Sequence, residues 1–284
     1  MWRKLKILLE MIKFEHTIFA LPFAYTGAFL AAQGLPSWKQ IVLILGAMVG
    51  ARTAAMTFNR IVDLPFDAEN PRTKDRPLVT GLVKTKDAWL LFLASIVLFF
   101  ACAKALNPLA FKLSPVALFI LLAYSYTKRF TWFCHVFLGL AIGLAPLAGW
   151  IAIRPTFELL PLLLSAGVLF WVAGFDILYA CLDEEFDRQR GLYSIPAKFG
   201  RQKAFLISAT FHALAFICFF LVGFLGKLNW WYYLGLLVTL VLFVAQRVVI
   251  SPRDLSRLNL AFFTFNGAIS VVLFFGTALA LLFK

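Results

Sequence analysis

The sequence predicts an all-α integral membrane protein with about nine transmembrane helices, and three observations support this fold class. First, 62% of the 284 residues are hydrophobic and only 14% are charged, whereas soluble domains carry roughly 45–50% apolar and about 25% charged residues. Second, the apolar residues gather into nine runs of the length expected for membrane spans. Third, the basic residues between the runs fall mostly on one side. A soluble enzyme could not cover its surface with this composition, and a disordered chain needs low hydrophobicity, so both classes are excluded.

The elements follow in order along a single polytopic domain, residues 1–284. Residues 1–16 are basic and amphipathic and lack a clean cleavage site, so we expect an interfacial helix that leads into a retained first span. Each apolar run is expected to be helical because the bilayer forces backbone polar groups to pair within the span. The spans are expected near residues 17–34, 40–58, 88–106, 114–127, 132–152, 158–182, 204–224, 228–246 and 260–283. Two polar stretches, about 59–87 and 176–203, are the candidate catalytic loops.

Nine spans place the two termini on opposite sides, so each loop can be assigned to a side of the membrane. Arg52 falls within the second span. The side opposite the N-terminus has Lys39, Lys104, Lys112, Arg154, Lys227 and Lys284. All the other Lys and Arg residues lie on the N-terminal side. Basic loops stay in the cytoplasm, so the N-terminus and both polar stretches are expected on the cytoplasmic face of a bacterial inner membrane. The net charge of +13 is therefore attributed to topology and anionic headgroups, and nucleic-acid binding is not expected.

The first candidate site lies where the second span ends. Asn59, Asp63 and Asp67 are spaced i, i+4, i+8, which places three oxygen ligands on one face of a helix. Pro65 falls between the last two and is expected to disturb the final turn. Closely spaced carboxylates repel one another, and a divalent cation removes that cost. Mg²⁺ suits oxygen-only sites and commonly bridges to substrate phosphates.

The second candidate site lies at the end of the sixth span. Asp176, Asp183 and Asp187 are spaced i, i+7, i+11, again on one helical face. Asp176 interrupts the apolar run WVAGFDILYACL, where an acid costs about 2.5–3.5 kcal/mol on insertion scales. It is therefore expected to face a cavity, a cation or a partner.

Basic residues accompany both acidic clusters. Arg72 follows the first cluster, Lys128 follows Tyr124 at the end of the fourth span, and Lys198 follows the second cluster. Carboxylates that hold Mg²⁺, surrounded by Arg and Lys, describe a diphosphate site. Arg52 lies seven residues before Asn59 on the same face. It could pair with an acid or bind the anionic group of a second substrate.

At these residues the chain resembles the UbiA family of intramembrane aromatic prenyltransferases. The family motif N-x-x-x-D-x-x-x-D is present as Asn59, Asp63 and Asp67, and the following R-T-x-x-R-P-L begins at Arg72. The motif D-x-x-Y-x-x-x-D-x-x-x-D is present as Asp176, Tyr179, Asp183 and Asp187, and the Y-x-x-x-K-R stretch as Tyr124, Lys128 and Arg129. The resemblance covers essentially the whole chain. Many members end the second motif with an adjacent Asp pair, whereas here Phe186 precedes Asp187, so Glu184 or Glu185 could replace a ligand.

The resemblance implies nine helices around a central cavity that opens to lipid and is capped on the cytoplasmic side. It implies Mg²⁺ held by Asp63, Asp67, Asp183 and Asp187, and a polyprenyl diphosphate bound by Arg72 and Lys128, with Tyr124 and Lys198 as further substrate-binding candidates. Asp176, Asn59 and Tyr179 would lie near the reacting carbon, and Arg52 could bind the carboxylate of an aromatic acceptor. That acceptor would be 4-hydroxybenzoate in quinone biosynthesis, or alternatively 1,4-dihydroxy-6-naphthoate in the futalosine route to menaquinone.

Two other functions fit the sequence less well than prenyl transfer. Membrane CDP-alcohol phosphotransferases also use Mg²⁺ and spaced Asp residues, but their D-G-x-x-A-R stretch and single compact acidic motif are absent from the sequence. A cation transporter predicts acids that face one another near mid-membrane without surrounding Arg and Lys. Only Asp176 suits that pattern.

Overall fold

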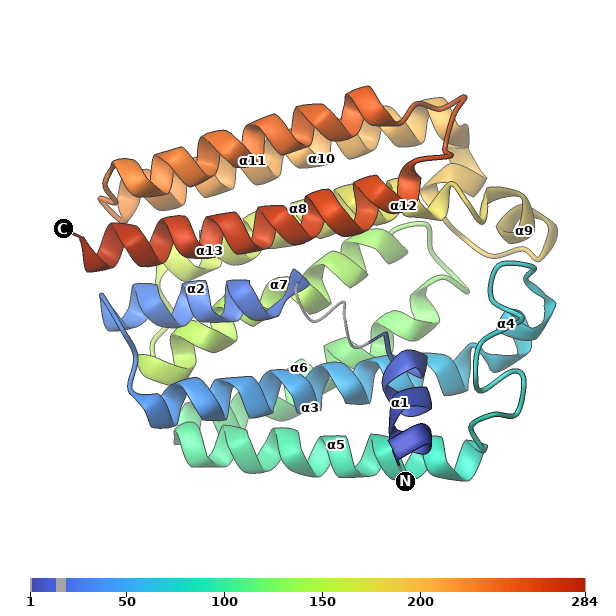
Figure 1. Ribbon diagram of the computed structural model, residues 1–284, viewed down its shortest axis with the longest axis horizontal. Coiled ribbons are helices and arrows are strands. Elements are labelled where there is room, and N and C mark those ends of the chain that lie inside the picture. Colours follow the sequence, from blue (N-terminus) through green and yellow to red (C-terminus); the bar gives the residue numbers. More distant parts are fainter. Residues whose placement is uncertain (1, 14–18, 284) are drawn as a thin grey trace.

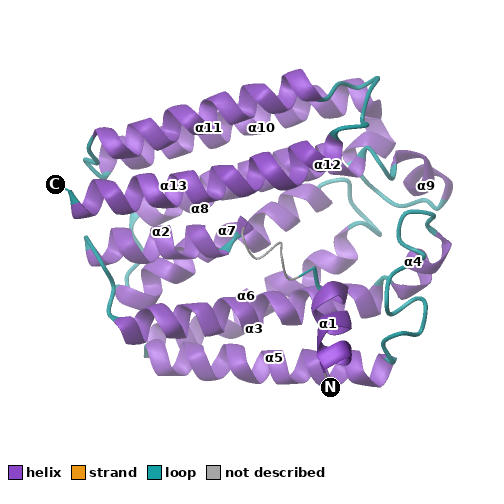
Figure 2. Ribbon diagram, in the orientation of Figure 1, coloured by secondary structure: helices purple, strands orange, loops and turns teal. Residues whose placement is uncertain are grey.

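The computed structural model describes residues 2–13 and 19–283, and within these ranges the secondary structure is helical, with no strand (Figures 1 and 2). The all-α prediction is therefore confirmed. In chain order the helices are α1 (Trp2–Met11), α2 (Leu21–Ala32), α3 (Trp38–Val62), α4 (Leu64–Glu69), α5 (Thr85–Leu106), α6 (Pro108–Thr127), α7 (Cys134–Ile153), α8 (Leu159–Ala180), α9 (Glu184–Gln189), α10 (Ile195–Leu225), α11 (Trp230–Val249), α12 (Leu258–Leu260), the π-helix η2 (Ala261–Phe265) and α13 (Asn266–Leu282).

Eight helices in the described residues are long and apolar enough to cross a membrane, with α12, η2 and α13 counted as one. The nine predicted spans thus differ from the structure at the first, 17–34, which contains the shorter helix α2. Its 12 residues would extend about 18 Å at about 1.5 Å per residue, against roughly 30 Å of hydrocarbon. The helix ends where Gln33 adopts a left-handed conformation with a φ of 53°. Residues 14–18 lie outside the described residues, as do parts of the predicted 1–16 helix, within which α1 falls.

The long helices lie roughly side by side, and α1 runs across one end of the bundle (Figure 1). The short helices α4 and α9 and the loops that follow them lie at that same end, whereas the C-terminus is at the other (Figures 1 and 2). The arrangement repeats a pattern of long span, six-residue helix and polar loop, first in α3–α4 and then in α8–α9. The two polar stretches of the sequence are thereby brought together.

Glycine allows α2 and α7 to pack with their backbones in contact. A Cβ atom on Gly149 would overlap the carbonyl of Ala24, and one on Gly27 would overlap the carbonyl of Pro146. Small residues permit this kind of close approach between membrane helices. The α2–α7 pair lines one side of the large cavity described below.

A buried polar network holds the π-helical turn η2 in the last span. The Asn266 side-chain oxygen accepts hydrogen bonds from Trp171 Nε1 (2.9 Å) and Gln246 Nε2 (3.0 Å). Its amide nitrogen donates to the carbonyl of Phe262 at 3.0 Å. Asn266 is only 1% exposed, so these contacts occur away from water. The turn places the Phe262 ring 4.2 Å from that of Tyr179.

We expect Asn266→Leu to lower the melting temperature of the purified protein. The change removes the shared acceptor of two buried donors, and an unpaired buried group costs about 1–3 kcal/mol. Thr277→Val is the matched control, since the buried Thr277 hydroxyl bonds only the carbonyl of Leu273 in its own helix. Equal melting temperatures for the two variants would contradict a stabilising role of the network.

Candidate active site

Two cavities follow one another along α3. A large apolar cavity of about 470 Å³ is bordered by Ala55 and Met56, and a smaller polar one of about 130 Å³ by Asn59 and Asp63, one turn further on. The polar cavity lies towards the bundle end that carries α4 and α9. Its lining is formed by Asn59, Arg60, Asp63, Phe66, Asp67, Asn70, Arg72, Thr73, Arg76, Lys128, Arg129, Asp183, Phe186 and Leu192. Six of the predicted site residues are among them: Asn59, Asp63, Asp67, Arg72, Lys128 and Asp183.

Three carboxylates border the polar cavity, those of Asp63, Asp67 and Asp183, whereas the predicted ligand Asp187 is fully buried and borders neither cavity. All four lie against cationic side chains. Arg72 contacts Asp183 with two nitrogens, Nε to Oδ1 at 2.9 Å and Nη2 to Oδ2 at 2.6 Å. Two further ion pairs are as short: Arg76 Nη1 to Asp67 Oδ2 at 2.5 Å and Lys128 Nζ to Asp187 Oδ1 at 2.7 Å. Arg129 Nη2 is more distant from Asp63 Oδ1, at 3.4 Å. The two motifs therefore meet as one network of alternating charge.

The local structure of the first motif explains how its oxygens reach the cavity. α3 ends at Val62, and Pro65 lies in the first turn of α4, where a missing N–H is tolerated. Hydrogen bonds from Asp63 N to Asn59 O and from Asp67 N to Asp63 O, 2.9 and 2.8 Å long, carry the helical spacing across the break. The predicted disturbance at Pro65 is thus a change of helix that keeps the three side chains at one cavity.

The second motif is divided between the two cavities. Asp183 borders the polar cavity, whereas Asp176 borders the apolar one. The division arises because α8 ends at Ala180 and the chain turns before α9, so that the three acids are not on one continuous helix. Asn70 Nδ2 donates to Asp183 Oδ1 at 3.0 Å, which ties the second motif to the loop after the first.

The environments of the carboxylates shift their pKa values in different directions. Burial, reinforced by the charge of Asp67, raises the pKa of Asp63. Burial also raises the pKa of Asp187, against the opposing effect of Lys128. At Asp183 burial is outweighed by the hydrogen bonds and charge of Arg72, so its pKa lies below the usual value. The bidentate arginine thus holds Asp183 in its charged form, whereas burial opposes the charged forms of Asp63 and Asp187.

The donor chemistry of the polar cavity fits a hard divalent cation. Within the part of the chain that the structure describes, no three His, Cys, Asp or Glu side chains converge as a preformed metal cluster. Carboxylates and the amides of Asn59 and Asn70 nevertheless line the cavity, and Mg²⁺ prefers such oxygen ligands and keeps several waters. A metal that binds these oxygens must compete with the Arg and Lys side chains that now contact them.

Phe186 stands where many family members have the first of two adjacent aspartates, and the structure shows what surrounds this position. Phe186 borders the polar cavity, and neither Glu184 nor Glu185 does. Glu184 instead pairs with Arg188 and Arg201 at 2.9 and 2.7 Å, while Glu185 is exposed. Neither glutamate replaces the missing second Asp of the motif at this cavity.

Tyr179 and Lys198 line neither cavity, and they differ in what they contact. The Arg72 guanidinium lies 5.4 Å from the Tyr179 ring centroid, so Tyr179 adjoins the network through this cation. The Lys198 ammonium lies 4.8 Å from the ring centroid of Trp132 and lines neither cavity. Tyr179 therefore lies close to the charged network, in keeping with its predicted role. Lys198 has no contact with the cavities that would support its predicted role.

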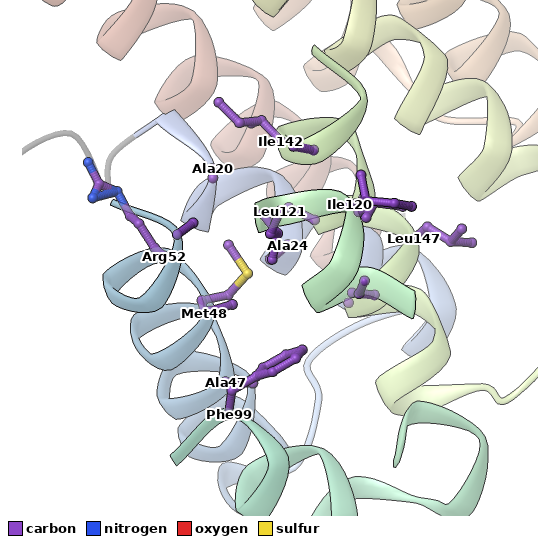
Figure 3. A pocket seen from close by; sticks show the side chains of 18 of the residues that line it. Ala20, Ala24, Ala47, Met48, Arg52, Phe99, Ile120, Leu121, Ile142 and Leu147 are labelled. Atoms are coloured by element: carbon purple, nitrogen blue, oxygen red, sulfur yellow. The ribbon is translucent and has the colours of Figure 1, made fainter. Parts of the chain in front are cut away.

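The apolar cavity is walled mainly by alanine, aliphatic and aromatic side chains, among them side chains of α2, α3, α5, α6 and α7 (Figure 3). Arg52, Tyr124 and Asp176 are the residues with strongly polar groups that border it. Arg52 lies at one edge, and its guanidinium extends away from Met48 and Leu121 (Figure 3). It donates to the backbone carbonyl of Lys13 at 2.8 Å. The cavity thus offers an apolar chamber with a few polar groups at its border.

His135, which the sequence does not single out, contacts the predicted site residue Asp176. Its Nδ1 lies 2.7 Å from Asp176 Oδ2, although the two residues are on different spans, α7 and α8. In the sequence His135 is one of three scattered histidines without metal-ligand spacing. Its only signal is a polar residue next to the start of an apolar run, which is too common to indicate a partner.

Comparison with known proteins agrees with this geometry. The sequence model of the UbiA prenyltransferase family matches residues 20–280. A protein from Methylobacillus flagellatus named 4-hydroxybenzoate octaprenyltransferase is 33% identical over 80% of this chain and 77% of its own length. A UbiA homologue from Aeropyrum pernix K1, solved in its apo form, is 35% identical with a TM-score of 0.83, over 92% of this chain and 96% of that one.

A second solved structure has the same fold at lower identity. It is a UbiA homologue from Archaeoglobus fulgidus bound to GPP and Mg²⁺, which is 24% identical with a TM-score of 0.74. The alignment covers 96% of this chain and 99% of that chain.

Proposed function

The chain belongs to the UbiA prenyltransferase family, and we propose that it transfers a polyprenyl group from a polyprenyl diphosphate to 4-hydroxybenzoate in quinone biosynthesis, with Mg²⁺ as cofactor. Prenyl transfer follows from the family. The choice of acceptor is supported by the names of relatives about 32% identical to this chain. The choice of metal is supported by the oxygen donors described above and by the Mg²⁺ in the homologue from Archaeoglobus fulgidus.

The observation that carries the proposal is the pairing of the two cavities. A polyprenyl diphosphate has a strongly charged head and a long apolar tail. The polar cavity presents cationic side chains, and the adjoining cavity is walled by aliphatic and aromatic side chains. The substrate therefore fits across both, with its reacting carbon between the Asn59 turn of α3 and the apolar chamber. A transporter would not need cations against the acids, and here Arg72, Arg76 and Lys128 contact them.

The acidic, basic and aromatic side chains would have different roles in cleaving the diphosphate. Asp63, Asp67, Asp183 and Asp187 would hold Mg²⁺, which when bound neutralises charge on the departing diphosphate. Arg72 and Lys128 bind phosphate oxygens, for which guanidinium and ammonium groups are suited. Because these donors are fixed before the reaction, they stabilise the developing negative charge without reorganisation. Tyr179, whose ring lies beside Arg72, would turn an aromatic face towards the allylic cation.

The acceptor would bind at the border of the apolar cavity. Arg52 is the cation there that can pair with an aromatic carboxylate, and Asp176 is the acid that can accept a hydrogen bond from a ring hydroxyl. Tyr124 also borders this region. The acceptor ring then lies between the polar groups and the prenyl tail, with Asn59 nearby on α3.

We place the protein in a bacterial inner membrane with the polar cavity on the cytoplasmic side. The membrane setting is supported by the eight helices of the described residues that are long and apolar enough to cross a membrane. The orientation is supported by the α4–α9 end of the bundle, where the loops together with the adjoining helix ends carry most of the Lys and Arg residues. Water-soluble acceptor and released diphosphate would exchange there, while the tail enters from the bilayer.

A transfer assay tests the proposal. Purified protein in lipid is given a labelled polyprenyl diphosphate with either 4-hydroxybenzoate or 1,4-dihydroxy-6-naphthoate, in Mg²⁺ or in EDTA. We expect Mg²⁺-dependent prenylation of 4-hydroxybenzoate. Product from the naphthoate alone would replace the acceptor by that of the menaquinone route, and transfer that persists in EDTA would contradict the role of the metal.

A further inference from the structure

We propose that His135 is a positioning residue for Asp176, and that the pair forms the proton-accepting group for the hydroxyl of the aromatic acceptor. The inference rests on the proposed function. His135 Nδ1 lies 2.7 Å from Asp176 Oδ2, and the His135 side chain is 3% exposed while that of Asp176 is 25% exposed. One oxygen of Asp176 is thus bound by the buried His135 side chain, while Asp176 itself still borders the apolar cavity.

The hydrogen bonds of His135 determine where its proton resides. The backbone N–H of Ile195, the first residue of α10, points at His135 Nε2 with a distance of 3.2 Å. A backbone N–H can only donate, so Nε2 must accept and carries no proton. The proton of the neutral ring is therefore on Nδ1, where it is donated to the Asp176 carboxylate. Both ring nitrogens are satisfied in this one tautomer.

This arrangement orients the carboxylate of Asp176. One of its oxygens is held by the N–H at His135 Nδ1, so the fixed rotamer leaves the second oxygen directed to one place. The same logic of an oriented base, held by a neighbour that itself does not meet the substrate, recurs in catalytic sites.

The proposed reaction moves the prenyl group from the diphosphate to a ring carbon of the acceptor. The bond between C1 of the prenyl group and the diphosphate oxygen breaks, and its electron pair leaves with the diphosphate. A ring carbon beside the acceptor hydroxyl forms the new bond to C1 as the hydroxyl proton passes to Asp176. The ring carbon then loses its own proton to the departing diphosphate, and Asp176 returns its proton to the oxygen. Asp176 touches the acceptor, whereas His135 acts only through Asp176.

The same contact links the acceptor side of the site to the diphosphate side. The segment that precedes α10 is bound to the α6–α7 connection by two further hydrogen bonds: Tyr193 N to Lys128 O at 2.7 Å and Cys134 Sγ to Tyr193 O at 3.3 Å. Lys128 pairs with Asp187, and His135 pairs with Asp176. The loop after α9 therefore sets the position of both pairs.

Two substitutions separate the two hydrogen bonds of His135. Asn places an amide N–H near the position of Nδ1, so His135→Asn can keep the bond to Asp176 and loses that to Ile195. Gln places its amide near Nε2, so His135→Gln can accept from Ile195 and loses the bond to Asp176. We expect His135→Gln to lower kcat roughly 10–100-fold, as loss of an orienting partner does elsewhere, with KM for the prenyl diphosphate unchanged. His135→Asn should recover most of kcat.

A double-mutant cycle with Asp176→Asn completes the test. Because His135 acts through Asp176, adding His135→Gln to Asp176→Asn should cost nothing further. Equal losses of kcat in His135→Gln and His135→Asn, or full additivity with Asp176→Asn, would overturn the inference and leave His135 as a packing residue. Melting temperatures exclude misfolding as the cause of either result. Wild-type protein that transfers no prenyl group to a hydroxylated acceptor would instead overturn the proposed function.

Discussion

Asp183→Asn is expected to lower turnover by roughly 10³-fold, because several kcal/mol of charge stabilisation at the diphosphate depend on this carboxylate. Asp183 contacts Arg72 through both oxygens and accepts from Asn70. Asn has the same shape but neither the charge for a metal nor a second acceptor oxygen for the guanidinium. Asp63→Asn should cost a similar factor, since Asp63 borders the same cavity from the other motif. The measurement is kcat in lipid at saturating substrates.

The matched controls for these variants lie within the same segments. Glu185→Gln removes an exposed acid from α9, and Asp75→Asn removes an exposed acid from the loop after α4. Neither residue borders a cavity, so both variants should turn over at the wild-type rate. Size-exclusion profiles and melting temperatures verify that all four variants are folded. Wild-type turnover in both Asp63→Asn and Asp183→Asn would rule out the proposed metal–diphosphate site.

The positions of the motif residues could be predicted because topology determines them. Asn59, Asp63 and Asp67 follow the end of one span, and Asp183 follows the end of another that runs in the same direction. Two such ends must lie at the same face of the membrane, whatever the packing between them. Helical spacing then selects which side chains share a face. This is sufficient to bring the two motifs to one cavity.

Other features depend on where helices end and on contacts between distant spans, which spacing does not specify. The turn between α8 and α9 separates Asp176 from Asp183, so the second motif serves both cavities. The first predicted span, 17–34, contains the shorter helix α2, which begins only at Leu21 and ends before the left-handed Gln33. His135 meets Asp176 only because α7 packs against α8, and Lys198 is drawn to the Trp132 ring. None of these follows from the residues of a single element.

The pairing of acids with cations predicts that Mg²⁺ and the prenyl diphosphate bind with strong positive coupling. A metal that binds alone must displace Arg72 or Lys128 from a carboxylate and leave a cation without its partner. A diphosphate that binds alone must draw the same cations away and leave a carboxylate uncompensated, which is costly for carboxylates as buried as Asp183 and Asp187. When both bind, the carboxylates turn to the metal and the cations to the phosphates, so every charge keeps a partner.

We therefore expect Mg²⁺ to raise the affinity for a non-hydrolysable prenyl diphosphate analogue roughly 10–100-fold, within the usual range of coupling energies. Titration of the analogue in Mg²⁺ and in EDTA measures this factor, and reciprocity requires that the analogue raise the affinity for Mg²⁺ equally. Arg72→Gln gives the discriminating result. It should weaken binding of the analogue, because a phosphate ligand is lost, yet strengthen binding of Mg²⁺ alone, because Asp183 is released from its bidentate partner. Weaker binding of both ligands in Arg72→Gln would show that Arg72 supports the metal site and does not compete with it.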